Sequence, residues 1–154
     1  MIYSEAITGE GNVFKKGSPQ SALQDFYQAF NTQSLMKMTD NWLQTEEASM
    51  SNPLGDVKRG WQAIVSVYER IFTGEAEVYV EFYDYSIHQQ NNFFFAVGRE
   101  RGYFKTEKEA LALAIRTSRV YRKHDGRWLQ LHHHGSIETP QLLAAYQSAV
   151  LKKL

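Results

Sequence analysis

A run of three histidines, His132 to His134, is the first feature of the sequence that could perform chemistry. On a strand, alternate side chains share a face, so His132 and His134 would lie together and His133 would point to the opposite side. Two imidazoles on one face suit acid–base chemistry or contact with a ligand, whereas a catalytic zinc site needs a third protein ligand. His88 and His124 lack the spacing of such a ligand, so we predict no metal. His132 and His134 are therefore candidate catalytic or ligand-contacting residues, and the alternative is that they only form hydrogen bonds in a polar patch or dimer interface.

Two arginines form a second candidate group. Arg99 and Arg119 fall on segments that we expect to be neighbouring strands. If both point into a cavity, their rigid guanidinium groups suit a carboxylate or another anion. The alternative is a pair of exposed arginines that bond Glu100 or other acids. The chain has no cysteine, and it has no nucleophile motif and no phosphate-binding glycine loop, so we predict no cofactor.

Bulky aromatic residues and one asparagine complete the candidate site. Trp42, Tyr68 and Tyr121 are large enough to line or fill a cavity, although aromatic residues at helical spacing more often belong to the core. Asn52 precedes Pro53 in a turn, where it either faces the mouth of the cavity or bonds its own backbone.

Length and charge limit the class of protein. The chain has 154 residues, with 17 basic and 17 acidic side chains and a formal net charge of zero. We expect a single domain over residues 1–154, with a core over about 18–137 and a C-terminal helix over 138–154. A basic excess is absent, so we predict no nucleic-acid partner. Because no apolar run approaches the about 18 to 20 residues of a membrane span and no signal peptide is visible, we predict no membrane partner and a cytoplasmic location.

The elements that must position these residues follow from the period of the apolar side chains. Ser18-Pro19 is typical of a helix start, and helical spacing predicts helices over 19–31, 34–42 and 61–73. After Gly74 the period changes to two, which predicts strands beginning near residues 77 and 93. The Ala- and Leu-rich stretch after Thr106 has helical propensity, but its strict alternation favours a strand over 110–123. Asp125-Gly126 is a tight-hairpin signal before a strand over 128–137.

The predicted order is therefore three helices, four long antiparallel strands and a terminal helix that starts at Thr139-Pro140. Helices on one side of an antiparallel sheet define the α+β class. A long, strongly twisted sheet that curls round helices leaves a cavity between the two layers, and the candidate residues are expected to line that cavity.

Four segments carry a resemblance to a known family. They are Asn52-Pro53-Leu54-Gly55, Ser118-Arg119-Val120-Tyr121, Asp125-Gly126-Arg127-Trp128 and His132-His133-His134-Gly135-Ser136. Together with the order of elements over about 18–136, they resemble the SnoaL-like group of the nuclear-transport-factor-like superfamily, which also contains ketosteroid isomerase. The hairpin segment is similar to the association domain of calcium/calmodulin-dependent protein kinase.

This resemblance implies a cone-shaped half-barrel in which about four long, curved strands wrap three N-terminal helices, commonly assembled as a homodimer. Asn52 stands where the isomerase has its general-base aspartate. Because an amide cannot take up a proton at neutral pH, ketosteroid isomerisation is not expected. Arg119 falls on an arginine that lines the pocket of the association domain, and Arg99 matches a second one more loosely.

We therefore expect a small-molecule-binding domain whose aromatic pocket holds arginine and histidine groups for a carboxylate- or carbonyl-bearing ligand. The expected ligand-binding residues are Asn52, Trp42, Tyr68, Arg99, Arg119, Tyr121, His132 and His134. One alternative is a cofactor-free isomerase, dehydratase or cyclase that uses a pocket histidine as its base. Another is an assembly module in which the outer face of the sheet forms a homodimer.

Overall fold

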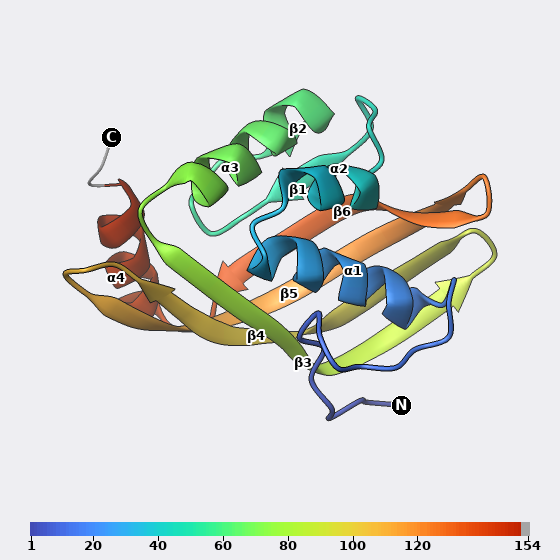
Figure 1. Ribbon diagram of the computed structural model, residues 1–154, viewed down its shortest axis with the longest axis horizontal. Coiled ribbons are helices and arrows are strands. Elements are labelled where there is room, and N and C mark those ends of the chain that lie inside the picture. Colours follow the sequence, from blue (N-terminus) through green and yellow to red (C-terminus); the bar gives the residue numbers. More distant parts are fainter. Residues whose placement is uncertain (152–154) are drawn as a thin grey trace.

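The computed structural model describes residues 1–151 and contains four helices and six strands within that range (Figure 1). In chain order they are α1 (Pro19–Asn31), α2 (Leu35–Asn41), β1 (Ser49–Ser51), β2 (Lys58–Arg59), α3 (Trp61–Thr73), β3 (Glu77–Gln90), β4 (Phe93–Lys105), β5 (Ala110–His124), β6 (Arg127–Ile137) and α4 (Pro140–Leu151). The three N-terminal helices, the four long strands and the C-terminal helix are those that the sequence predicts. The last three residues of the predicted helix over 138–154 lie outside the described residues.

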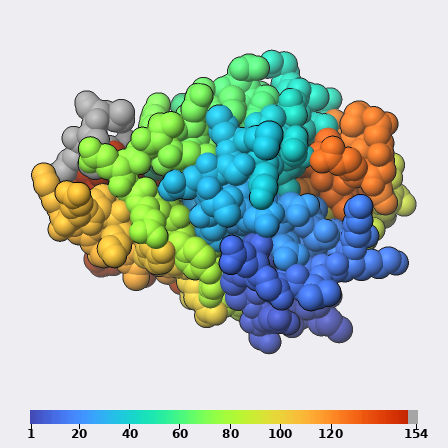
Figure 2. Space-filling view, in the orientation of Figure 1, coloured from blue at the N-terminus to red at the C-terminus, as the bar shows by residue number. Residues whose placement is uncertain are grey.

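The strands form one curved sheet in the order β2-β1-β6-β5-β4-β3. The four long strands pair antiparallel, as predicted. The sheet as a whole is mixed, because the short strand β1 joins its edge parallel to β6 and β2 then pairs antiparallel to β1. Helices α1, α2 and α3 lie over one face of this sheet, and α4 lies at one end (Figure 1). The space-filling view shows the same arrangement, with the helical residues in blue to green covering much of this face (Figure 2).

Side-chain caps fix the starts of the first two helices. The Ser18 hydroxyl accepts a hydrogen bond from the backbone N–H of Ser21 at 3.2 Å, and the Ser34 hydroxyl accepts one from Lys37 at the same distance. These bonds satisfy N–H groups that have no partner inside the helix. At the other end of α1, the Asn31 amide bonds both the N–H and the C=O of Val80. Helix α1 is thereby held against β3.

Alternation along β4 and β5 decides which side chains face the helices. The buried positions of β4 are Phe94, Ala96, Glu100 and Phe104, and those of β5 are Leu113, Thr117, Arg119 and Tyr121. The residues next to these positions along each strand face away from the helices. Most inward residues are apolar and form the core, so the charged pair Glu100 and Arg119 is the exception that needs an explanation.

A β-bulge interrupts the alternation of β6. Tyr121 pairs with Gln130 while Val120 pairs with His132, so Leu131 is an extra residue between the two pairs. One extra residue reverses which side chains face the core. Trp128 and Gln130 face inward before the bulge, and the inward positions after it are odd-numbered and begin with His133.

Candidate functional site

Two connected hollows lie between the sheet and the helices. The inner cavity has a volume of about 80 Å³ and lies against the sheet. The outer hollow, of about 570 Å³, lies between α3, α4 and the loop that follows Asn52. They share six lining residues, namely Asn52, Leu54, Val67, Ile71, Val78 and Tyr146. The inner cavity therefore adjoins the outer hollow along these six residues.

Most residues that line the inner cavity are apolar, and its two charged side chains both come from the sheet. Its helical wall contains Phe26, Val67, Tyr68 and Ile71. The polar side chains on its sheet wall are Glu100 of β4, Arg119 of β5 and His133 of β6. Each of these three is at least nine-tenths buried. A few polar groups at the end of an apolar hollow are typical of a small-molecule site.

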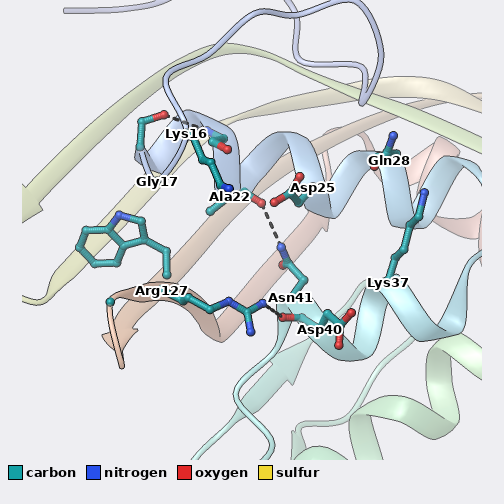
Figure 3. Close-up of a pocket in the computed structure, with 13 residues that line it drawn as sticks. Lys16, Gly17, Ala22, Asp25, Gln28, Lys37, Asp40, Asn41 and Arg127 are labelled. Atoms are coloured by element: carbon teal, nitrogen blue, oxygen red, sulfur yellow. Dashed lines mark hydrogen bonds between the residues drawn. The ribbon is translucent and has the colours of Figure 1, made fainter.

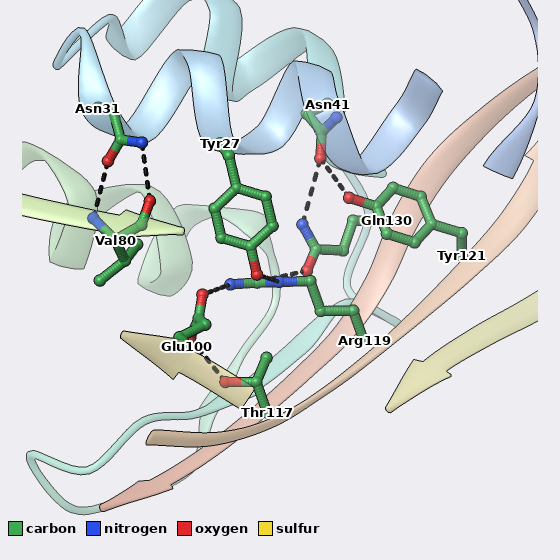
Figure 4. Close-up of polar contacts among 9 residues, drawn as sticks. All are labelled: Tyr27, Asn31, Asn41, Val80, Glu100, Thr117, Arg119, Tyr121 and Gln130. Atoms are coloured by element: carbon green, nitrogen blue, oxygen red, sulfur yellow. Dashed lines mark hydrogen bonds and ion pairs between the residues drawn. The ribbon is translucent and has the colours of Figure 1, made fainter. Parts of the chain in front are cut away.

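Arg119 is held by three oxygen atoms from three different elements (Figure 4). Its Nη1 donates to Gln130 Oε1 at 2.7 Å, its Nη2 donates to Glu100 Oε2 at 3.2 Å, and its Nε donates to Tyr27 Oη at 3.3 Å. The guanidinium also lies 3.6 Å from the centre of the Phe26 ring, which is close enough for a cation–π contact. These contacts fix the orientation of the guanidinium plane.

Further hydrogen bonds support the ends of this network (Figure 4). The Thr117 hydroxyl donates to Glu100 Oε1 at 2.6 Å. Asn41 Oδ1 accepts from the Tyr121 hydroxyl at 2.9 Å and from Gln130 Nε2 at 3.2 Å. The network thus extends from β4 through β5 and β6 to the end of α2. A fully bonded buried network is rigid, because any displacement breaks bonds that water cannot replace.

The charges in this network compensate each other. Arg119 is 2% exposed and Glu100 is 4% exposed, so neither charge is solvated from outside. Burial alone would lower the pKa of Arg119, but the neighbouring oxygens of Tyr27 and Glu100 raise it above its ordinary value. Burial raises the pKa of Tyr68 to about 12. The guanidinium is therefore charged and the phenol neutral at physiological pH, and the inner end of the cavity is polar without a net charge.

His133 is the third polar residue of the inner cavity. Burial and the nearby Arg119 guanidinium hold the pKa of His133 well below its usual range, and the Ser118 backbone opposes this shift with a smaller effect. The imidazole is therefore neutral at physiological pH. Its Nδ1 atom is buried and lacks a hydrogen-bond partner of ordinary geometry. A neutral imidazole has one N–H and one lone pair, so His133 adds a possible hydrogen-bond acceptor to the wall of the inner cavity.

The prediction that His132 and His134 face the cavity is wrong, and the bulge at Leu131 is the reason. Both residues lie on the opposite side of the sheet from His133. His132 Nδ1 is 2.7 Å from the hydroxyl of Ser49 on the neighbouring strand, and His134 is exposed. Neither histidine lines either of the two connected hollows. His132 thus forms hydrogen bonds, as in the alternative given above, and His134 faces solvent.

The prediction that Arg99 joins Arg119 inside the cavity is also wrong. Arg99 is an odd-numbered residue of β4, and its neighbour Glu100 occupies the inward position. The Arg99 guanidinium forms a bidentate ion pair with Glu138, with N···O distances of 2.6 and 2.8 Å. Hydrogen bonds from Arg99 lower the pKa of the Glu138 carboxyl. Arg99 therefore anchors the chain that leads into α4.

The other predicted site residues divide between the cavity wall and the core. Tyr68 lines the inner cavity, and Asn52 lines both hollows. Asn52 Oδ1 also accepts from the backbone N–H of Leu54 at 3.0 Å, which is the turn bond expected of its alternative role. Trp42 and Tyr121 are fully buried core residues that line neither hollow. Tyr121 nevertheless supports the network through Asn41.

Several residues of the site were not among those predicted from the sequence. They are Tyr27, Glu100, Gln130, His133 and Tyr146. The signal for Glu100 lay in the alternation of β4, because Glu100 is an even-numbered residue and falls on the same face of the strand as the apolar Phe94 and Ala96. In the same way, Gln130 falls on the same face of its strand as Trp128. His133 had no such signal, because a bulge cannot be located from the alternation that it breaks.

A third hollow lies at the other end of the helical layer (Figure 3). It has a volume of about 480 Å³ and is bordered by the start of α1, by α2 and by the β5–β6 turn. Lys16, Lys37 and Arg127 line it together with Asp25 and Asp40. All five of these charged side chains are exposed, and both signs are present. This hollow is therefore a solvated polar groove, and it shares no lining residue with the other two.

Within residues 1–151, no three His, Cys, Asp or Glu side chains gather closely enough to hold a metal ion. None of the described helices is both long and apolar enough to cross a membrane.

Solved structures share this fold. A putative calcium/calmodulin-dependent protein kinase type II association domain from Thiobacillus denitrificans has a TM-score of 0.65 and 23% identity, covering 84% of this chain and 100% of that chain. A putative dehydratase from the NTF2-like family of Streptomyces avermitilis has a TM-score of 0.67 and 17% identity, with coverages of 77% and 93%. An uncharacterized protein with a cystatin-like fold from Caulobacter vibrioides has a TM-score of 0.65 and 20% identity, with coverages of 86% and 94%. The chain therefore has the NTF2-like, cystatin-like α+β fold.

The sequence places the chain more narrowly within this fold. Residues 20–140 match the SnoaL-like domain family. The chain belongs to this family, which confirms the resemblance drawn from the turn, strand and hairpin motifs. No curated protein matches the sequence.

Proposed function

We propose that this domain binds a small, largely apolar molecule whose body lies where the two hollows meet and whose neutral carbonyl group accepts a hydrogen bond from Arg119 in the inner cavity. The observation that carries the proposal is a buried, charged guanidinium that lines an otherwise apolar cavity. A guanidinium has five N–H donors, and three of them bond the oxygens of Gln130, Glu100 and Tyr27. The SnoaL-like family and the concave fold support a ligand-binding role.

The charge of the site favours a carbonyl over a carboxylate. Glu100 already compensates Arg119 at an N···O distance of 3.2 Å, and His133 is neutral. A carboxylate ligand would bring a second negative charge beside the buried Glu100 side chain. Like charges at buried positions repel strongly, because the effective dielectric constant is low. A ketone avoids this repulsion and still accepts a hydrogen bond.

A matched pair of aromatic ligands tests this proposal. Acetophenone and benzoate have similar shapes and differ in charge. We expect acetophenone to raise the melting temperature of the protein and to bind at least about tenfold more tightly than benzoate in calorimetry, because only native-state binding stabilises the fold. Tighter binding of benzoate would show that Glu100 does not set the charge of the site.

Two tryptophan variants show whether the binding belongs to the cavity. Val67 lines both hollows, so Val67→Trp fills the passage between them. Ser66 is the adjacent exposed residue of α3, so Ser66→Trp adds the same side chain outside the cavity. Acetophenone should bind the Ser66→Trp protein and fail to bind the Val67→Trp protein. Equal binding to both variants would place the ligand elsewhere.

Proton-transfer catalysis is the second candidate function, and His133 is the observation that favours it. A neutral buried imidazole beside a charged guanidinium combines a base with a group that stabilises a developing oxyanion. One structural neighbour bears the description of a putative dehydratase. If this chain catalyses a similar reaction, exchange of the α-protons of bound acetophenone with deuterium should be accelerated, and His133→Phe should abolish the acceleration. Exchange at the uncatalysed rate would remove this candidate.

We also propose that the outer face of the sheet joins two copies of this chain. Phe93, Phe95 and Val97 project from this face of β4, and each is between 43% and 46% exposed. Water-exposed apolar side chains in a row are typical of a protein–protein interface. A structural neighbour described as an association domain supports a role in self-association. Light scattering at micromolar concentration should give the mass of a dimer, and a monomer would refute this assembly.

A further inference from the structure

The inner cavity contains hydrogen-bond acceptors as well as the Arg119 donor. Glu100 lines the cavity and is 4% exposed. Its Oε1 accepts from Thr117 and its Oε2 accepts from Arg119. The Tyr27 hydroxyl also interacts with this carboxylate, and because a carboxylate has about four lone-pair sites, Glu100 can still accept a hydrogen bond from a ligand.

His133 adds a second acceptor to the same wall. It lines the inner cavity and is 7% exposed, and its imidazole is neutral. Either tautomer of a neutral imidazole keeps one lone pair. The buried Nδ1 atom has no hydrogen-bond partner of ordinary geometry. Two side chains that can accept hydrogen bonds, Glu100 and His133, therefore lie on the same wall of the inner cavity as the Arg119 donor.

These acceptors discriminate between ligands. Water can bond them while the cavity is empty, but a ligand that displaces water and offers only C–H groups leaves them unbonded. A buried polar group without a partner is unfavourable, and sites built to bond a hydroxyl reject analogues that lack one. A simple ketone forms a hydrogen bond with Arg119 but offers none to the acceptors. A ligand with a hydroxyl next to its carbonyl satisfies the donor and one acceptor together.

We propose that the ligand of this site is a hydroxy-carbonyl compound, whose carbonyl oxygen accepts from Arg119 and whose hydroxyl donates to His133 or Glu100. This inference rests on the proposed function, because it specifies the group at the inner end of the carbonyl ligand. It narrows the proposed ligand from any small ketone to a molecule that accepts one hydrogen bond and donates another at the same end.

A pair of ketones of nearly equal size provides the test. α-Hydroxyacetophenone and propiophenone differ only by a hydroxyl in place of a methyl group. We expect α-hydroxyacetophenone to bind the wild-type protein at least about tenfold more tightly in calorimetry. Acetophenone is measured beside them as the reference for the proposed function.

The outcomes separate the two proposals. If the three ketones bind with affinities within about twofold of one another, the hydroxy-carbonyl inference is overturned while the proposed function stands. Binding of none of them refutes the proposed function and the inference together. A preference for α-hydroxyacetophenone that persists in the Val67→Trp protein would also overturn the inference, because that variant closes the cavity.

Two variants then identify the acceptor. His133→Phe removes one acceptor with a ring of similar shape, and Glu100→Gln weakens the other. The preference for the hydroxyl should fall below about threefold in at least one of them, and an unchanged preference in both contradicts the inference. His132→Phe is the matched control, because His132 lies on the opposite side of the sheet and should keep the preference. The wild-type comparison decides the question even if Glu100→Gln does not fold.

Discussion

Replacing Glu100 by glutamine removes the charge that compensates Arg119 and changes little else. The two side chains are 4% and 2% exposed, and their N···O distance is 3.2 Å. Removing one partner of a buried ion pair leaves a charge that neither water nor protein compensates, and the usual loss is about 3–5 kcal/mol of unfolding free energy. We expect Glu100→Gln to lower the unfolding free energy by about 3 kcal/mol, near the lower end of this range, because the amide oxygen still accepts a hydrogen bond from Arg119.

A double-mutant cycle isolates the interaction between the two charges. Arg119→Met should cost about 3–5 kcal/mol, because it leaves the Glu100 carboxylate with only the Thr117 hydroxyl. The double variant should cost less than the sum of the single variants by at least about 2 kcal/mol, since no unpaired charge remains. Urea unfolding followed by tryptophan fluorescence measures all four proteins.

A second pair on the same sheet serves as the control. Arg101 and Glu81 form an ion pair of 2.7 Å on the outer face, where the arginine side chain is 53% exposed. Exposed pairs contribute about 0–1 kcal/mol, so the Arg101–Glu81 cycle should give a small coupling energy. A Glu100–Arg119 coupling energy no larger than that of the exposed pair would show that water reaches the network. The buried, unsolvated character of the Glu100–Arg119 ion pair would then be refuted.

Three further changes test other parts of the structure. Burial lowers the pKa of His133 below that of an unfolded histidine, so stability should be full above about pH 6.5 and fall by about 1 kcal/mol towards pH 5.5 in urea titrations. Burial also lowers the pKa of His132, so His133→Gln should remove most but not all of this loss, and His134→Gln should retain it. An equal loss in both variants would assign it to another group. Phe95→Glu should convert a dimer to a monomer in light scattering, whereas Val13→Glu, at a position 97% exposed, should not. A Cβ at Gly102 would overlap a backbone carbonyl of β3, so Gly102→Ala should lower the unfolding free energy by about 3 kcal/mol, and a change below about 0.5 kcal/mol would contradict this packing.

Local sequence signals were sufficient to predict most of the fold. The Ser18 and Ser34 caps, the change to a period of two after Gly74 and the Asp125-Gly126 turn each act within a few residues, and each appears in the structure. The extended segment 46–51 was predictable, but its place in the sheet was not, because β1 pairs with β6, about eighty residues away in the chain, and β2 pairs with β1. The alternation after Thr106 correctly overruled helical propensity, since packing on the sheet determines that segment.

The site was predictable only where alternation stays regular. Arg119 faces the cavity as the resemblance implied, while the parity of β4 places Arg99 outside and Glu100 inside. The extra residue Leu131 exchanged the roles of the histidines, so His133 rather than its neighbours lines the cavity. A bulge depends on the pairing of two strands, and one strand read alone does not contain that information.

The central claim is that a hollow reaches from the surface between α3 and α4 to the buried guanidinium of Arg119. A crystal of the protein soaked with 4′-bromoacetophenone tests it directly, because the bromine atom is located by its anomalous scattering. We expect an anomalous peak among the residues that line both hollows, such as Val67 and Tyr146, and carbonyl density within hydrogen-bond distance of Arg119. Side-chain density that fills the interior, with bromine bound only on the outer surface of the protein, would contradict the account.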